Sequence, residues 1–268
     1  MNKENKKAEK MEALFGSIGK EFYHVLILDK SGSMDVRVNE TITGLNEQIQ
    51  TIKDLEKKNA HQIHNVTLVT FNYDIDYDLY CDSASKLNEF TKADYKPTGG
   101  TALNKAIYNT VEKLKTTIEK KGGESSVFVT ILTDGENNDY TVSADTVKKV
   151  VEEQQKQGWV FSFIGCSQDT IEQAASLGIH KGYTVTMDAS NMADTRAKFK
   201  SMSVARSYYS SVDLSSSETL NFATLDSLSD EVKNDLLAGN TFTTNVTSTN
   251  VTSTIDPTIT TDLNSKKD

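Results

Sequence analysis

Three short polar segments of the chain carry oxygen ligands in a pattern that suits a metal ion. Asp29-Lys30-Ser31-Gly32-Ser33 follows one apolar run, Thr98-Gly99-Gly100-Thr101 precedes a long helical pattern, and Thr133-Asp134-Gly135 follows a second apolar run. Ligands of open parallel sheets lie outside the carboxyl ends of the strands, so we expect the three segments to meet at one edge. They would present there two carboxylates and three hydroxyls, from Asp29, Ser31, Ser33, Thr101 and Asp134.

The chemistry of these five side chains indicates a hard divalent cation. All of them offer hard oxygen, which favours Mg²⁺, with Mn²⁺ as a substitute. Two carboxylates leave such an ion formally neutral and hydroxyls donate weakly, so the metal stays electrophilic. A carboxylate from a partner protein would then complete its octahedron. We expect Gly32 to allow a tight turn between the two serines, and Gly99 and Gly100 to do the same beside Thr101.

The elements that must position these segments alternate between strands and helices. Apolar runs predict strands at residues 23–28, 66–71, 127–132, 159–164 and 183–187, and apolar residues at helical spacing predict helices at 42–58, 102–121, 143–157, 170–177 and 191–212. Residues 75–79 alternate apolar and acidic side chains, and the tight Asn72-Tyr73 link predicts a hairpin with the preceding strand. The expected fold class is α/β, with a three-layer, Rossmann-like, doubly wound and mostly parallel sheet and one antiparallel edge strand.

In this order and strand context, the three motifs resemble the metal-ion-dependent adhesion site of von Willebrand factor type A domains. The resemblance covers roughly residues 23–212, and the stretch around Gly165 to Ile179 is similar to compact intracellular members from bacteria and phages. It implies that the serines and the threonine bind Mg²⁺ directly and that the aspartates bind it directly or through water. It further implies a protein-binding module that is not an enzyme, a partner with an exposed Asp or Glu, and association with an ATP-driven remodelling machine.

Two other functions compete with this interpretation. A structural or assembly protein, for instance in a phage particle, would use the same metal-bridged contact, and the sequence does not separate it from a binding module. A Mg²⁺-dependent phosphohydrolase would use the same oxygens. Against the enzyme, no general base or phosphate-binding loop is evident, and Ser31 stands where the Asp-x-Asp-x-Thr pattern of aspartyl-phosphate hydrolases has its second aspartate.

Other groups of candidate ligands are weaker. The acidic residues at 74, 76 and 78 resemble the start of an EF-hand loop, but Leu79 stands where that loop needs glycine. The solvent face of an edge strand is the favoured interpretation of these residues. His61 and His64 lie in a polar link without a third ligand, which favours solvated side chains.

Composition and charge bound the remaining possibilities. The chain has 268 residues, of which 37% are hydrophobic and 25% charged, so most of it can bury a core. No stretch approaches the roughly 20 apolar residues of a membrane-spanning helix. A net charge of −9 disfavours a nucleic-acid partner. Only Cys81 and Cys166 are present, which makes no disulfide framework and favours a reducing, cytoplasmic compartment.

The chain is predicted to contain one domain with extensions at both ends. Residues 1–20 form a leader charged with both signs, and residues 21–212 form the domain that carries the motifs. Residues 213–240 read as an acidic, partly helical extension. Residues 241–268 form a Thr/Ser-rich tail with a repeated Asn-Val-Thr-Ser-Thr segment, a composition that cannot bury a core and predicts flexibility.

Overall fold

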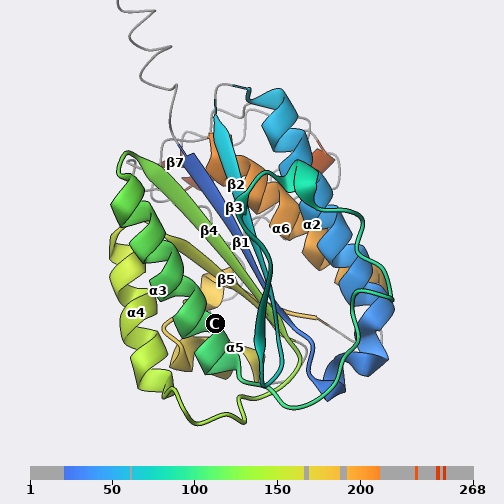
Figure 1. Cartoon of the computed structure of the whole chain (residues 1–268). Helices are drawn as coiled ribbons and strands as arrows, with labels where there is room; N and C mark the ends of the chain where they lie inside the picture. The colour runs from blue at the N-terminus through green and yellow to red at the C-terminus, as the bar shows by residue number, and fades with distance from the viewer. Residues whose placement is uncertain are drawn as a thin grey trace, which may run out of the picture.

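A six-stranded sheet forms the centre of the computed structural model, which describes residues 21–60, 62–165, 169–187, 192–211, 233–234, 246–247 and 250–251. The strand order is β3-β2-β1-β4-β5-β6 (Figure 1). Neighbouring strands are parallel except for β2 and β3, which are antiparallel. This topology confirms the predicted sheet with one antiparallel edge strand. The strands span Glu21–Asp29 (β1), Ile63–Phe71 (β2), Ile75–Asp82 (β3), Ser125–Thr133 (β4), Val160–Gly165 (β5) and Thr184–Thr186 (β6).

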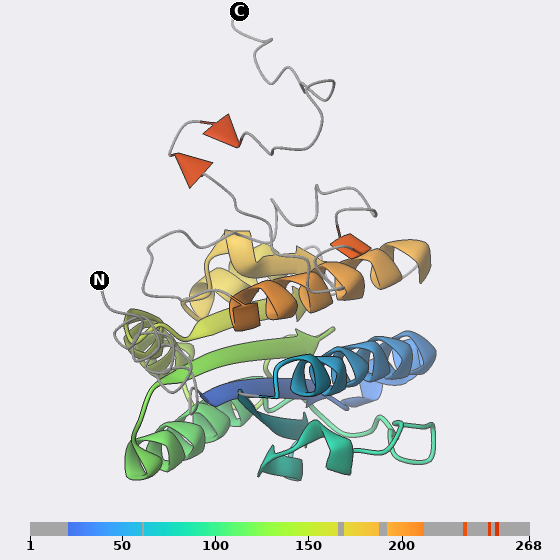
Figure 2. The same ribbon diagram turned by 90° about the horizontal axis from the view of Figure 1, so that it is seen from above.

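Helices cover both faces of the sheet, so the molecule has three layers (Figures 1 and 2). One face packs against α2 and α6, and the other packs against α3, α4 and α5. Each side has its own apolar core, and the residues of β1 alternate between the two. The helices span Val38–Lys58 (α2), Leu103–Lys121 (α3), Ala144–Lys156 (α4), Thr170–Ser176 (α5) and Met192–Ser211 (α6).

The sequence pattern of each strand reflects which of its faces is buried. β1 is buried along its whole length, because helices cover both of its faces, and it therefore reads as a continuous apolar run. The edge strand β3 behaves differently, since Asp76 and Asp78 are exposed while Ile75 and Tyr77 are half-buried. This alternation confirms the predicted strand with one solvent face.

Within the residues that the structure describes, there are also three short 3₁₀ helices that the sequence did not predict. They span Gly32–Arg37 (η1), Ala84–Lys86 (η2) and Lys181–Tyr183 (η3). Segments of three to six residues are too short to show a hydrophobic period, which is the signal that revealed the longer helices. The first matters for function, because η1 contains the second serine of the Asp-x-Ser-x-Ser motif.

A buried polar network lies between the sheet and α6. The guanidinium of Arg206 is fully buried and bonds Gln48 Oε1 at 3.3 Å, Thr130 Oγ1 at 2.8 Å and His24 Nδ1 at 3.0 Å. His24 Nε2 in turn lies 2.9 Å from His64 Nδ1. The prediction that His64 is solvated was wrong, because β2 begins three residues earlier than expected and places this ring in the interior. His61 lies outside the described residues.

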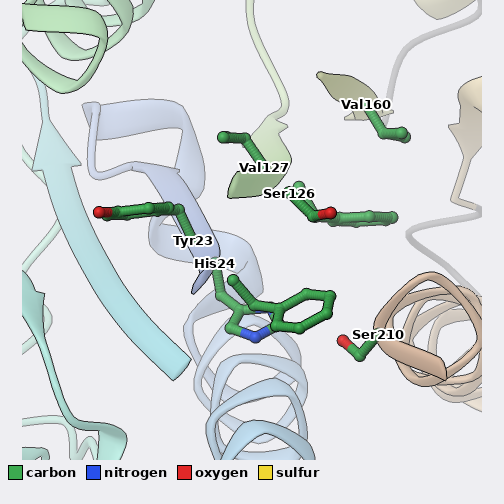
Figure 3. A pocket seen from close by; sticks show the side chains of 8 residues that line it. Tyr23, His24, Ser126, Val127, Val160 and Ser210 are labelled. Carbon is green, nitrogen blue, oxygen red and sulfur yellow. The ribbon is translucent and has the colours of Figure 1, made fainter. Parts of the chain in front are cut away.

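A small pocket lies beside this network, at the amino-terminal ends of the strands (Figure 3). Its lining includes His24 of β1, Ser126 of β4, Val160 of β5 and Ser210 of α6. Its size suits a single water molecule. The three polar segments singled out from the sequence follow the opposite ends of the strands, so this pocket is separate from them.

Several predicted segments fall outside the part of the chain that the structure describes. These are the leader, Cys166, and most of the acidic extension and tail. Within the tail, the described residues form a two-residue antiparallel pair between β7 (Val246–Thr247) and β8 (Asn250–Val251). In the described part of the chain, no helix has the length and hydropathy needed to cross a bilayer.

Candidate metal centre

The fold places the polar segments on neighbouring loops at the carboxyl edge of the sheet. Asp29 is the last residue of β1 and Asp134 follows the last residue of β4, and these two strands are parallel neighbours. The loop before α3 reaches the same edge, because Thr98 N donates to the carbonyl of Lys30 at 2.8 Å and Gly32 N donates to the carbonyl of Gly99 at 3.1 Å. The three segments therefore meet where the strand order requires.

Hydroxyl and carboxylate oxygens are in direct contact at this edge. Ser31 Oγ lies 3.1 Å from Ser33 Oγ, and Ser33 Oγ donates to Asp134 Oδ1 at 2.6 Å. A Cβ atom added to Gly135 would lie 3.5 Å from Thr101 Oγ1 and 3.6 Å from Ser33 Oγ. Gly135 thus leaves open the space beside both hydroxyls, and a side chain at this position would project into it.

Asp29 is held in one orientation by its neighbours. It is completely buried, with Oδ1 accepting from Ser31 N at 2.7 Å and Oδ2 accepting from Thr133 Oγ1 at 2.6 Å. Burial raises the pKa of Asp29, the bonds from Thr133 and Ser31 oppose that rise, and the nearby charge of Asp134 adds to it. A cation bound between the two carboxylates would relieve both the desolvation and the repulsion.

Arg37 supplies a positive charge on the other side of Asp134. Its Nε lies 3.3 Å from Asp134 Oδ2, and the Asp134 side chain is only 4% exposed. This Nε atom is buried and has no hydrogen-bond partner in the described part of the protein. Sequence reasoning missed Arg37, although it lies four residues after Ser33. The available signal was the need of two buried carboxylates for compensating charge.

Two further residues that the sequence analysis did not assign to the site shape the loop of Thr101. Asn138 accepts from Thr101 N through Oδ1 at 2.7 Å, and its own N–H donates to the Thr101 carbonyl at 2.9 Å. Tyr73 packs over Gly100, where an added Cβ would come within 2.3 Å of the tyrosine ring. Position 100 therefore requires glycine because the Tyr73 ring lies too close to the backbone for a side chain.

The glycine expectations at the neighbouring positions have different outcomes. Gly99 has φ of +78°, a conformation that favours glycine. Gly32 has no positive φ, and an added Cβ would meet its nearest atom, the Gly99 carbonyl oxygen, at an ordinary 3.5 Å. The turn between the two serines is made by the start of η1, which other residues can also adopt.

The donor set fits the cation expected from the sequence. Across the described residues, no group of three or more His, Cys, Asp or Glu side chains gathers in a way that could hold a metal. A site at this edge must therefore combine its two carboxylates with hydroxyls, a set that suits Mg²⁺ or Mn²⁺ better than softer metals. The five residues that would hold it are Asp29, Ser31, Ser33, Thr101 and Asp134.

Comparison with known proteins gives one family match. The model of the von Willebrand factor type A domain matches residues 25–200. No curated protein sequence matches the chain.

Solved structures with a similar arrangement are distant in sequence. The ArnB paralog VWA2 from Sulfolobus acidocaldarius is 18% identical with a TM-score of 0.47, over 69% of this chain and 45% of that one. Proximal thread matrix protein 1 from the mussel byssus, with a zinc-occupied MIDAS motif, is 16% identical with a TM-score of 0.46, over 70% and 46%. The manganese-loaded TRAP protein of Plasmodium vivax is 18% identical with a TM-score of 0.47, over 68% and 74%. The chain thus spans less than half the length of the first two.

Proposed function

This chain belongs to the von Willebrand factor type A domain family, and from that premise we propose that it is a divalent-metal-dependent module for binding proteins. The observation that carries the proposal is the contact of Ser31, Ser33 and Asp134 oxygens at the carboxyl edge of the sheet. Bound Mg²⁺, or Mn²⁺ in its place, would offer an open coordination position to a carboxylate oxygen of the partner. The partner is a protein that exposes an Asp or Glu at its surface.

Each residue of the centre has a distinct role in this proposal. Asp29 and Asp134 balance the charge of the ion, and the Ser31, Ser33 and Thr101 hydroxyls complete its oxygen environment without adding charge. Thr133 and the Ser31 amide keep the Asp29 carboxylate in place. Hydrogen bonds within the segment from Asp29 to Ser33, and between it and Thr133 and Asp134, hold four of the five residues in place before the ion arrives.

The proposed activity is binding without turnover. Two histidines belong to described strands of the sheet. His24 and His64 lie in the amino-terminal parts of β1 and β2, away from the centre. No His or Cys within the described residues bonds either serine of the motif, and the one carboxylate that accepts from Ser33, that of Asp134, is assigned to the ion in this proposal. Cys81 is a free thiol, which supports the proposal of a reducing compartment such as the cytoplasm. Within the proposed binding function, an ATP-driven remodelling machine is one class of partner.

Thermal unfolding with and without metal tests the proposal. A ligand present at about a hundred times its dissociation constant stabilises the folded state by about 2.7 kcal/mol, so Mg²⁺ or Mn²⁺ should raise the unfolding temperature of the wild-type protein. Asp134→Asn should abolish this rise because it removes one of the two charges that hold the ion. Glu136→Gln, an exposed change two residues away, is the matched control and should keep the full rise.

Titration calorimetry with Mn²⁺ compares the same three proteins by their dissociation constants for the ion. The expected stoichiometry for the wild type is one ion per chain. Equal metal-dependent stabilisation in wild type and Asp134→Asn would refute the centre. Loss of the effect in Glu136→Gln as well would show that it comes from general screening of acidic charge.

A further inference from the structure

Exposed apolar side chains gather around the proposed metal centre. Five large apolar residues are strongly exposed in the described part of the chain, and four of them lie on loops or helix ends at the carboxyl edge of the sheet. These four are Val36 at 78%, Tyr73 at 56%, Tyr140 at 88% and Ile171 at 51% exposure. The fifth, Ile63, begins β2 at the opposite edge. Because exposed apolar groups on a soluble domain are usually scattered, this gathering indicates a contact surface.

Direct bonds tie the segments that carry these side chains to the centre. Val36 belongs to η1, the same short helix as Ser33. Next to Tyr73, Asn72 accepts from Ala102 N at 2.8 Å and donates through Nδ2 to the Thr98 carbonyl at 2.9 Å.

The other two side chains are tied to the centre in the same way. The loop of Tyr140 is joined to Thr101 through Asn138, and the helix of Ile171 is joined to the Gly135 carbonyl through Gln173 Nε2 at 2.9 Å. We call the four apolar side chains, with the acidic residues beside them, the rim.

The rim has a second regular property, which is acidity. Each of the four exposed apolar residues of the rim has an acidic neighbour in sequence, and Glu136 lies between Asp134 and Tyr140. None of these carboxylates takes part in an ion pair among the residues described. The five carboxylates of the rim are Asp35, Asp74, Glu136, Asp139 and Glu172.

Cations on the same loops are fewer and mostly engaged. Lys30 pairs with Asp76, and Arg37 pairs with Asp134. Lys105 contacts the Tyr73 carbonyl at 3.4 Å, and Lys96 is exposed before the loop of Thr101. The surface around the centre is therefore apolar and negative, in a chain whose net charge is −9.

We propose that the rim selects a basic and apolar segment of the partner protein, in which one carboxylate is flanked by Lys or Arg and by an aromatic or aliphatic side chain. The single carboxylate rests on the proposed function, since it would bind the metal. The flanking chemistry follows from the rim itself. Tyr73 and Tyr140 are of a residue type that is enriched among the anchors of interfaces. The rim carboxylates attract basic flanks and repel acidic ones within a Debye length of about 10 Å at 0.1 M salt.

This arrangement gives specificity through repulsion as well as attraction. A metal with an open position accepts any accessible carboxylate, so the metal alone discriminates poorly among acidic surfaces. Negative charge around the metal makes an acidic partner segment unfavourable, and it leaves the basic one as the better ligand. The rim would thus decide which Asp or Glu reaches the centre.

A displayed peptide library tests the proposal with the full chain as bait. Each peptide carries a fixed central Asp within random flanks, and selection is done in Mg²⁺ at 0.1 M salt. We expect enrichment of Lys or Arg and of an aromatic or aliphatic residue within a few positions of the fixed Asp. A synthetic copy of an enriched peptide then serves as the probe for affinity measurements.

Charge and apolar variants of the rim give matched comparisons with that probe. The double variant Asp35→Lys with Glu136→Lys should weaken binding by about tenfold or more, as expected for charge reversal beside an interface, while Glu119→Lys at the far end of α3 should not. Tyr140→Ser should weaken binding by about tenfold, as expected for loss of an aromatic anchor, while Ile63→Ser at the opposite edge should not.

The outcomes separate the rim from the metal. If binding persists in EDTA but still depends on Asp35, Glu136 and Tyr140, the metal-dependent function fails and the selectivity of the rim stands. If binding needs Mg²⁺ but shows no basic enrichment, or is insensitive to the rim variants, the inference about the rim is overturned and the proposed function stands. A library that yields no binder counts against the inference, because the rim would then add too little energy to hold a linear segment.

Discussion

At the scale of single residues, Arg37 and a bound cation act on the same carboxylate. The guanidinium stands 3.3 Å from Asp134 Oδ2, while Ser33 donates to Asp134 Oδ1. In the metal-free protein this positive charge offsets part of the repulsion between Asp134 and the buried Asp29. Once a divalent ion is present, the same charge opposes it. Arg37 therefore stabilises the empty centre at the expense of affinity for the metal.

The residue-scale prediction is that Arg37→Gln binds Mn²⁺ more tightly and is less stable without metal. Removing a unit charge several ångströms from a partly buried ion changes its binding by about 1 kcal/mol, or roughly fivefold in the dissociation constant. Titration calorimetry gives the affinity, and thermal unfolding in EDTA gives the stability. Lys96→Gln, which removes an exposed charge nearby, is the control and should change both quantities little. Weaker Mn²⁺ binding by Arg37→Gln would mean that the arginine supports the ligands and does not compete with the ion.

At the scale of elements, α6 is attached to the sheet by an unusual polar contact. Arg206 places a buried guanidinium over the ring of Phe128, 4.7 Å from its centroid, and no carboxylate pairs with it within the described part of the chain. Burial lowers the pKa of Arg206 to about 9. The network needs His24 Nδ1 as an acceptor toward this cation, so His24 must be neutral there.

The element-scale prediction concerns pH. Burial, then Arg206 and His64, lower the pKa of His24 well below its usual 6.5. In the unfolded chain His24 takes up a proton below pH 6.5, whereas in the folded protein it stays neutral to lower pH. The unfolded state thus binds more protons in that window, so the stability of the fold falls as pH drops below about 6.5 and is fully restored above it.

Denaturant unfolding between pH 7.5 and pH 5 measures this effect. We expect a steeper loss of unfolding free energy in wild type than in His24→Gln, whose amide oxygen can still accept from Arg206. Gln50→Ala, at an exposed position of α2, is the control and should follow the wild-type profile. Parallel profiles for wild type and His24→Gln would exclude His24 as the source of acid sensitivity.

How far the sequence predicts these elements depends on whether the signal is local. The helix of α3 and the buried strand β4 were predicted within two residues of their observed ends, because apolar runs and helical spacing are properties of adjacent residues. Arg206 and His24 were not recognised as partners, because they are 182 positions apart and meet only after the sheet has formed. A buried polar residue has no periodic signature of its own.

The same distinction applies to the candidate centre. The Asp-x-Ser-x-Ser spacing and the strand ends predict that these oxygens share an edge, and the described contacts of Ser33 and Asp134 agree with that expectation. Their binding of Mg²⁺ stays a prediction. Arg37 and Asn138 were not foreseen, because their positions depend on the 3₁₀ helix η1 and on the loop after β4, which carry no periodic pattern.

At the scale of the whole molecule, the two apolar cores share the strands of one sheet. Residues of β1 alternate between them, with Leu26 in the core under α2 and α6, and Ile27 in the core under α3, α4 and α5. Neither layer of helices can therefore lose its packing without disturbing the strands that support the other. The layers are expected to unfold together, and the loops of the metal centre, which link the two sides, would be lost in the same step.

The whole-molecule prediction uses the single tryptophan as a reporter for the far side of the sheet. Trp159 lies in the core under α3, α4 and α5, and Ile52 of α2 is fully buried in the other core. Ile52→Ala removes buried side-chain volume and should cost about 2–5 kcal/mol of unfolding free energy. If the cores are coupled, Trp159 fluorescence and far-ultraviolet circular dichroism should shift to the same lower denaturant midpoint. Gln50→Ala, on the exposed side of α2, should change that midpoint little. A tryptophan transition that keeps its wild-type midpoint while the dichroism transition moves would show that the two layers unfold independently.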